Sequence, residues 1–109
     1  MDITFFGLKS CDTCRKSFKT LSESGHNVTY IDVRSDGVGM DNLEKFQCAF
    51  GKALINTRST TWRNLSEKER ARPALQLLTE YPTLMKRPVI AARDTLFLGW
   101  GKDVQGRFL

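Results

Sequence analysis

Two cysteines three residues apart are the clearest chemical feature of this sequence. Cys11 and Cys14 form a C-x-x-C pair, and Cys48 is the only other cysteine. An offset of three residues places both thiols on one side of a helix, so Cys14 can reach and resolve a mixed disulfide formed on Cys11. The pair therefore predicts thiol–disulfide chemistry, with Cys11 as the nucleophile and Cys14 as the resolving thiol.

Positive charge surrounds the first cysteine of the pair. Cys11 stands where a short apolar strand ends and a helix is expected to begin, so unpaired backbone N–H groups and the helix dipole favour its thiolate. Lys9, Arg15 and Lys16 add positive charge nearby. Asp12 acts in the opposite direction. Because the thiolate is the reactive form of cysteine, these features predict a pKa for Cys11 below the usual value of about 8.5.

Two further interpretations of the pair stay open. A zinc site also uses C-x-x-C, but it needs about four ligands, and only Cys48 and His26 remain as candidates, so no metal site is predicted. Alternatively, Cys14 is a small core residue on the apolar side of the helix, because buried free cysteine is a common core residue. In that case Cys11 acts alone.

The elements that must position the pair form a β-α-β unit at the start of the chain. The apolar, β-branched and aromatic run at residues 3–6 predicts a buried strand, which Gly7 closes. Over residues 12–24 apolar side chains recur at helical spacing, and Gly25 follows as a stop signal. Residues 28–31 predict a second strand, which a right-handed crossover places parallel to the first.

Helices and then a hairpin complete the predicted fold. Residues 43–50 carry an apolar helical stripe, and Ser66 with Glu69 fits a capping box ahead of further helix. Residues 88–92 and 95–98 predict an antiparallel hairpin, after which a short polar helix ends the chain. This order predicts an α/β, thioredoxin-like (glutaredoxin-like) fold over residues 1–109 as a single domain, with a helical insertion between its N-terminal β-α-β and C-terminal β-β-α parts.

Charge and hydropathy indicate where the protein works and what it binds. Its 109 residues carry a net charge of +5 with a pI of about 9.4. No block of like charges or nucleic-acid module appears, so direct nucleic-acid binding is not predicted. The sequence shows neither a secretory leader nor a transmembrane run, which predicts a cytoplasmic protein that does not bind membranes. No glycine-rich nucleotide loop is visible, so no bound cofactor is expected.

Three segments together resemble the arsenate reductase–Spx family. They are residues 11–16 (CDTCRK), 56–63 (NTRSTTWR) and 86–90 (KRPVI), in this order along nearly the whole chain. The second segment is most similar to the short branch of the family called YffB. The C-x-x-C is more similar to Spx, a transcriptional regulator that binds RNA polymerase. The resemblance implies the thioredoxin-like fold and a catalytic role for the first cysteine.

The resemblance also implies roles for four further residues. Arsenate reductases surround their catalytic cysteine with arginines that hold an oxyanion, and Arg58 and Arg87 match two of these positions. Arg15, in the helix turn beside the nucleophile, is a further candidate anion ligand. Pro88 matches a proline that is cis in the family and faces the cysteine loop. A third family arginine has no counterpart, because residues 97–100 read FLGW.

These features predict a monomeric thiol-dependent reductase. Cys11 attacks a disulfide such as a glutathione adduct, or an oxyanion such as arsenate, while Arg58 and Arg87 orient the anionic group. Glutathione is the expected reductant or co-substrate, and a glutaredoxin is a candidate partner. The alternative hypothesis is a redox-sensing regulator similar to Spx, in which the cysteine pair controls binding to RNA polymerase.

Overall fold

The computed structural model describes all residues, 1–109, and the chain divides into two compact units. The first unit combines residues 1–36 with residues 87–109, and the second comprises residues 37–86. The second unit is the segment that the sequence predicts as a helical insertion. The prediction of a single domain over residues 1–109 stays a prediction.

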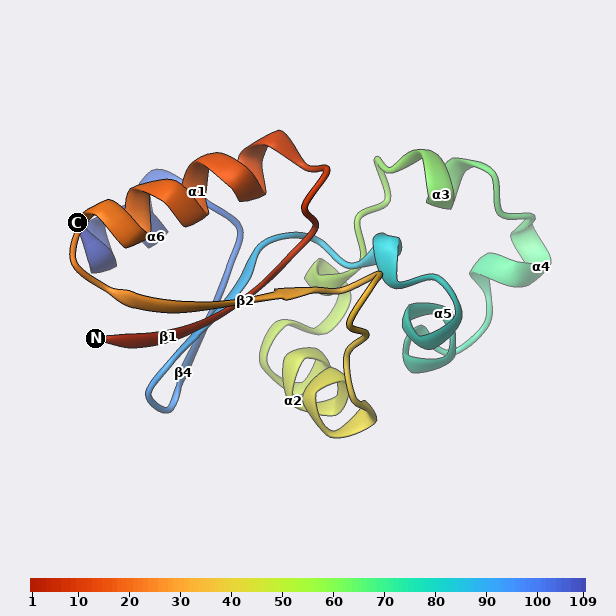
Figure 1. Cartoon of the computed structure of the whole chain (residues 1–109). Helices are drawn as coiled ribbons and strands as arrows, with labels where there is room; N and C mark the ends of the chain where they lie inside the picture. Colours follow the sequence, from red (N-terminus) through yellow and green to blue (C-terminus); the bar gives the residue numbers. More distant parts are fainter. The chain divides into compact units, whose positions relative to one another are not determined.

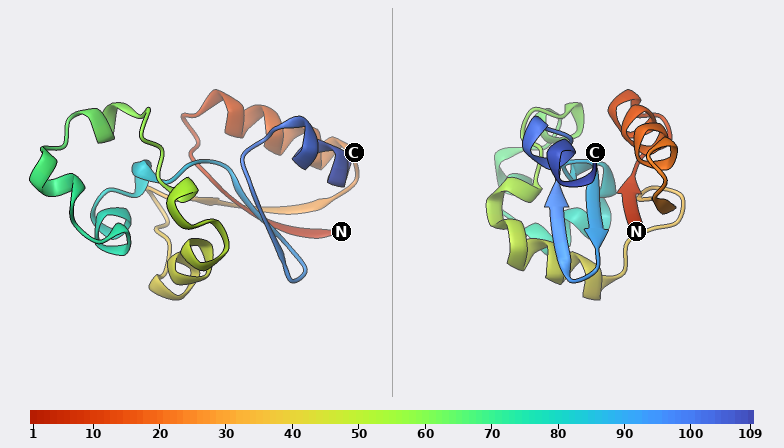
Figure 2. Two further views of the ribbon diagram at one scale, coloured as in Figure 1. Left: turned by 180° about the vertical axis from the view of Figure 1, so that it is seen from behind. Right: turned by 90° about the vertical axis from the view of Figure 1, so that its left-hand side faces the viewer.

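The first unit is built on a four-stranded mixed sheet in the order β2-β1-β3-β4. β1 runs parallel to β2 and antiparallel to β3, and β3 pairs antiparallel with β4. Figure 2 shows the β3–β4 hairpin with its strands pointing in opposite directions. The strands are β1 (Asp2–Gly7), β2 (Asn27–Asp32), β3 (Val89–Ala92) and β4 (Thr95–Leu98). Both the predicted parallel pair and the predicted hairpin are confirmed.

Two helices cover one face of this sheet. α1 (Asp12–Glu23) makes the crossover between the parallel strands, and α6 (Lys102–Phe108) ends the chain beside it (Figure 1). Leu21 of α1 is completely buried, because strand residues such as Phe5 and Ile90 point into the same core. Burying each such side chain contributes about 1.5–3 kcal/mol to stability. The resulting core holds the N-terminal end of α1 in place over the sheet.

The second unit is helical throughout. Its core consists mainly of leucines, together with one phenylalanine and one methionine. The buried residues include Leu43, Phe46, Leu77, Leu78, Leu84 and Met85. One half of the predicted capping box is present, since the Ser66 hydroxyl accepts a hydrogen bond from the Glu69 N–H at 3.2 Å, whereas the Glu69 carboxylate accepts a hydrogen bond from the Tyr81 hydroxyl. The elements are α2 (Met40–Phe50), η1 (Gly51–Leu54), α3 (Thr60–Arg63), α4 (Glu67–Arg70), α5 (Ala74–Glu80) and η2 (Pro82–Leu84).

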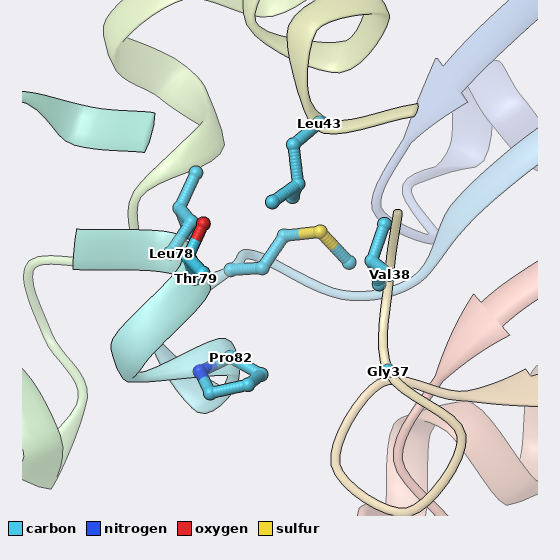
Figure 3. Close-up of a pocket in the computed structure, with 7 residues that line it drawn as sticks. Gly37, Val38, Leu43, Leu78, Thr79 and Pro82 are labelled. Carbon is cyan, nitrogen blue, oxygen red and sulfur yellow. The ribbon is translucent and has the colours of Figure 1, made fainter. Parts of the chain in front are cut away.

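A small apolar cavity lies within the second unit. Figure 3 shows Leu43, Leu78 and Pro82 around it, and its volume is about 120 Å³. Met85 also lines the cavity, and its backbone forms an isolated antiparallel β-bridge with Ile55. No polar group with catalytic chemistry points into this cavity, because Thr79 is the only polar side chain in its lining.

Neither a membrane span nor a metal cluster is found in the structure. No helix is both long and apolar enough to cross a bilayer. No three His, Cys, Asp or Glu side chains come together in a way that could hold a metal ion.

Candidate active site

The candidate active site lies where two neighbouring strands of the first unit meet the cysteine loop. Because β1 and β3 are antiparallel and Phe6 pairs with Val89, the end of β1 and the start of β3 share one edge of the sheet. The cysteine loop follows β1, and Arg87 precedes β3 with its cis peptide bond to Pro88. The sheet thus brings together two segments of the chain that are far apart in the sequence.

Cys11 occupies the N-cap position of α1. Its backbone N–H donates to the Leu8 carbonyl at 2.9 Å, which closes a tight turn between strand and helix, and its side chain is partly exposed. Burial alone would raise the pKa of the Cys11 thiol. The Cys14 N–H and thiol, and then the Arg87 guanidinium, outweigh burial and hold this pKa below its usual value. Cys11 is therefore accessible and poised to act as a thiolate.

Cys14 is fully buried one turn further along α1. Burial, together with the negative charge of the Cys11 sulfur, raises the pKa of Cys14 to about 11, although the Leu8 N–H acts against this rise. The pKa values of the two thiols are therefore shifted in opposite directions, and the two thiols also differ in exposure. This asymmetry is what a nucleophile and a resolving thiol require.

Gly7 brings the end of β1 close to the buried thiol. A Cβ at this position would lie 2.7 Å from Cε1 of Phe5 and 3.0 Å from both Sγ of Cys14 and Oη of Tyr30. The approach to Phe5 is closer than real Cβ atoms come to other heavy atoms, and the two approaches at 3.0 Å are unusually tight. Any larger residue would therefore force Phe5 to move and would press on Cys14 and Tyr30. The absence of a side chain at Gly7 is what lets the sulfur and the phenol oxygen border the same small space.

Tyr30 of β2 is the second unforeseen member of this site. Its ring packs against Phe5 and Phe18, with centroid distances of 5.0 Å to each. Its hydroxyl is buried and has no hydrogen-bond partner. Burial, followed by the charge of the Cys14 sulfur, raises the pKa of Tyr30 to about 12. The phenol therefore keeps its proton at any physiological pH.

Asp32 supports the loop that leads to Cys11. Its buried carboxylate accepts hydrogen bonds from the backbone N–H of Lys9 at 2.8 Å and from those of Arg34 and Ser35 at 2.9 Å each. Burial by itself would raise the pKa of Asp32, but these hydrogen bonds lower it to about 2. The carboxylate thus stays charged and ties the cysteine loop to the end of β2.

The structure treats the predicted anion ligands differently. Arg87 faces Cys11, as described above. Arg15 is exposed and forms an ion pair with Asp12 in the first turn of α1, so the carboxylate competes with any bound anion. Arg58 lies in an exposed loop of the second unit, where its backbone N–H donates to the Asn56 side chain at 3.0 Å. An anion-binding role for Arg58 stays a prediction.

An open recess adjoins the cysteine loop on the first unit. It is lined by the apolar rings of Phe18 and Tyr30 and by the long side chains of Lys9 and Arg15, and its volume is about 350 Å³. Apolar walls with two cations suit a ligand that carries both an apolar group and a negative charge.

Sequence reasoning missed Gly7, Tyr30 and Asp32 as members of the site, although Gly7 and Asp32 left a signal. Gly7 and Asp32 end the two predicted parallel strands, and strand ends that share a sheet edge are where sites commonly form. Tyr30 stands out less, because a tyrosine in a strand is usually a packing residue. Only its register beside Phe5 shows that its hydroxyl reaches the site.

Comparison with known proteins finds relatives along nearly the whole chain. Residues 6–108 match the model of the ArsC family. A protein of unassigned function from Haemophilus influenzae is 40% identical, over 97% of this chain and 98% of its own length. The global transcriptional regulator Spx of Bacillus subtilis is 26% identical, over 98% of this chain and 86% of the regulator.

Solved structures show the same fold. A protein named YffB superposes with a TM-score of 0.87 at 26% identity, covering 98% of both chains. An arsenate reductase (ArsC) related protein from Brucella melitensis has a TM-score of 0.76 at 28% identity, covering 99% of this chain and 94% of that one. The predicted thioredoxin-like α/β fold is thereby confirmed.

Proposed function

Because this chain belongs to the ArsC family, we propose that it is a thiol-dependent oxidoreductase whose nucleophile is Cys11. The observation that carries the proposal is the asymmetry of the two thiols. Cys11 is accessible, and its pKa is held down beside Arg87, whereas Cys14 is buried with a pKa near 11. A purely structural pair of cysteines does not need this difference.

The proposed reaction begins with a disulfide substrate. The Cys11 thiolate attacks one sulfur, so that a Cys11–substrate disulfide forms and the other half leaves as a thiolate, which takes a proton from water. Cys14 then gives its proton to water and attacks the Cys11 sulfur, so that the second half of the substrate leaves as a thiolate, which takes up a proton, and a Cys11–Cys14 disulfide remains. Two external thiols restore the dithiol form and are themselves oxidised to a disulfide.

Glutathione is the proposed reductant, and anionic thiol adducts are the proposed substrate class. The guanidinium of Arg87 beside Cys11 favours a negative charge on the substrate, because arginine offers several donors at constant charge. The recess beside the cysteine loop is also lined by Lys9 and by Arg15, although Arg15 is paired with Asp12. Arsenate is a second candidate substrate, suggested by the family and by the ArsC-related relative from Brucella melitensis. This chemistry requires a supply of reduced thiols, which a cytoplasmic location would provide. A glutaredoxin is a candidate electron donor.

Turnover of a small disulfide tests the proposal. Hydroxyethyl disulfide is offered with glutathione, glutathione reductase and NADPH, and arsenate replaces the disulfide in a parallel assay. We expect Cys11→Ser to abolish activity, whereas Cys48→Ser, which removes an exposed thiol of the second unit, keeps it. No turnover by the wild type with either substrate, or equal turnover by Cys11→Ser, would contradict the proposal.

A redox-sensing regulator is the second candidate function. The similarity to Spx extends over 98% of this chain, and both the C-x-x-C and the asymmetric thiols suit a disulfide switch. Its proposed partner is RNA polymerase. Co-purification with polymerase from cells grown with and without an oxidant separates the two proposals, because only a regulator is expected to bind polymerase in a manner that depends on the Cys11–Cys14 disulfide.

A further inference from the structure

The phenol of Tyr30 is a buried polar group beside the cysteine pair to which the reaction above gives no role, and its oxygen is without a hydrogen-bond partner. Burying such a group unpaired costs free energy. The glycine at position 7 opens a space that is bordered by this hydroxyl and by the Cys14 sulfur. An unpaired donor next to a sulfur that must become charged points to a role during the reaction.

We propose that the Tyr30 hydroxyl is the hydrogen-bond donor that stabilises the Cys14 thiolate while it resolves the mixed disulfide on Cys11. The inference rests on the proposed role of Cys14 as the resolving thiol. The Cys14 sulfur and the Tyr30 hydroxyl border the same space beside Gly7, each 3.0 Å from where a Cβ of residue 7 would lie, so Gly7 leaves room for both groups.

The protonation states of the two groups suit this exchange. Cys14 is a thiol at rest, since burial raises its pKa to about 11, and a thiol attacks a disulfide only after losing its proton. Tyr30 stays protonated, because its own pKa is about 12, so it can donate but not compete as a base. A neutral thiol gains little from this donor, whereas a thiolate gains a charge-assisted hydrogen bond. The Tyr30 hydroxyl therefore stabilises the Cys14 thiolate in the second step, in which Cys14 resolves the mixed disulfide.

Other groups that face Cys14 do not replace this donor. The Leu8 N–H and the Arg87 guanidinium also favour the thiolate. The Leu8 N–H belongs to the backbone turn, and Arg87 acts on Cys11 as well. Of these donors, only the Tyr30 hydroxyl can be removed by a substitution that deletes a single atom. Tyr30→Phe removes the oxygen and keeps the ring that packs against Phe5 and Phe18.

The two steps can be followed separately with dithiobis(nitrobenzoate) in a Cys48→Ser background. Cys11 attacks first and releases one thionitrobenzoate, and Cys14 then releases the second as the Cys11–Cys14 disulfide forms. We expect Tyr30→Phe to leave the first phase unchanged and to slow the second about three- to tenfold between pH 7 and pH 9. This range reflects fewer thiolates, partly offset by the greater nucleophilicity of a more basic thiolate. Tyr81→Phe is the matched control, because it removes a phenol oxygen in the second unit, where the Tyr81 hydroxyl donates a hydrogen bond to Glu69.

A second variant, at Gly7, tests the space between Cys14 and Tyr30. Gly7→Ala places a methyl group against Sγ of Cys14 and Oη of Tyr30 and should also slow the second phase selectively. Circular dichroism establishes that each variant is folded. The proposal is overturned if Tyr30→Phe leaves the second phase unchanged, if it slows both phases equally, or if the wild type shows no second phase. A Tyr30-dependent second phase without turnover of hydroxyethyl disulfide or arsenate would support the proposal while contradicting the proposed function.

Discussion

Replacing Asp32 with asparagine should cost the first unit about 2.5 kcal/mol of stability at neutral pH. The magnitude follows from the carboxylate's hydrogen bonds to three backbone N–H groups, which lower its pKa from 3.8 to about 2. A difference of about two pKa units between the unfolded and folded states corresponds to that free energy, at 1.36 kcal/mol per unit. Asparagine keeps the shape of the side chain but carries no charge.

The pH dependence has a definite sign. Because the pKa of Asp32 is lower in the folded state, its contribution is complete above the unfolded value of 3.8 and is lost as the pH falls through the folded value of about 2. The difference in stability between wild type and Asp32→Asn should therefore shrink to about half at pH 3. At neutral pH the difference should be constant.

Urea unfolding at pH 7 and pH 3 measures this, with circular dichroism and tryptophan fluorescence as probes. Asp94→Asn is the control, because Asp94 is exposed in the β3–β4 turn. A loss below about 0.5 kcal/mol at pH 7, or an equal loss at both pH values, would refute the argument that hydrogen bonds to the charged carboxylate hold the cysteine loop.

Three further predictions concern the pair and its support. Arg87→Gln should move the pKa of Cys11 upward, because it removes a guanidinium that favours the thiolate; alkylation rates against pH measure this, with Arg93→Gln in the exposed hairpin turn as the control. Cys14→Ser should leave Cys11 open to alkylation but abolish the intramolecular disulfide, which mass mapping after mild oxidation detects. Leu21→Ala should destabilise the first unit by about 2–5 kcal/mol, because it leaves a cavity beneath α1, and urea unfolding tests it. An unmoved alkylation profile, a persisting disulfide, or a loss below about 1 kcal/mol would contradict the respective statement.

Local sequence signals are enough to predict the fold of the first unit. The run at residues 3–6 gave a strand, the stripe at 12–24 a helix, and the two apolar runs near the end a hairpin, and β1, α1, β3 and β4 follow these closely. Such elements depend on periodicity and on glycine stop signals, which are local properties. What local signals do not contain is the pairing of β1 with β3, which depends on residues more than eighty positions apart.

The site is predictable only in part, for the same reason. The cysteine pair is recognisable because its spacing is local. Arg87 is predicted as a site residue only because the sequence around it resembles the arsenate reductase–Spx family. Gly7, Tyr30 and Asp32 matter because strand pairing brings them around one loop, and no spacing in the sequence reveals that. Arg15 is predicted as an anion ligand from its position beside Cys11, but the structure pairs it with Asp12, which lies within one helix turn.

The pairing of β1 with β3 has a consequence for how the protein acquires its reactivity during folding. The β-α-β segment and the β3–β4 hairpin each contain mostly local contacts, but residues 37–86 separate them in the chain. Closing so long a loop is entropically costly, so the hairpin should join the sheet late. Until it does, Arg87 is absent from the neighbourhood of Cys11. The pKa of the Cys11 thiol should therefore be higher in the nascent chain than in the folded protein. A smaller thiolate fraction would slow its oxidation before folding is complete.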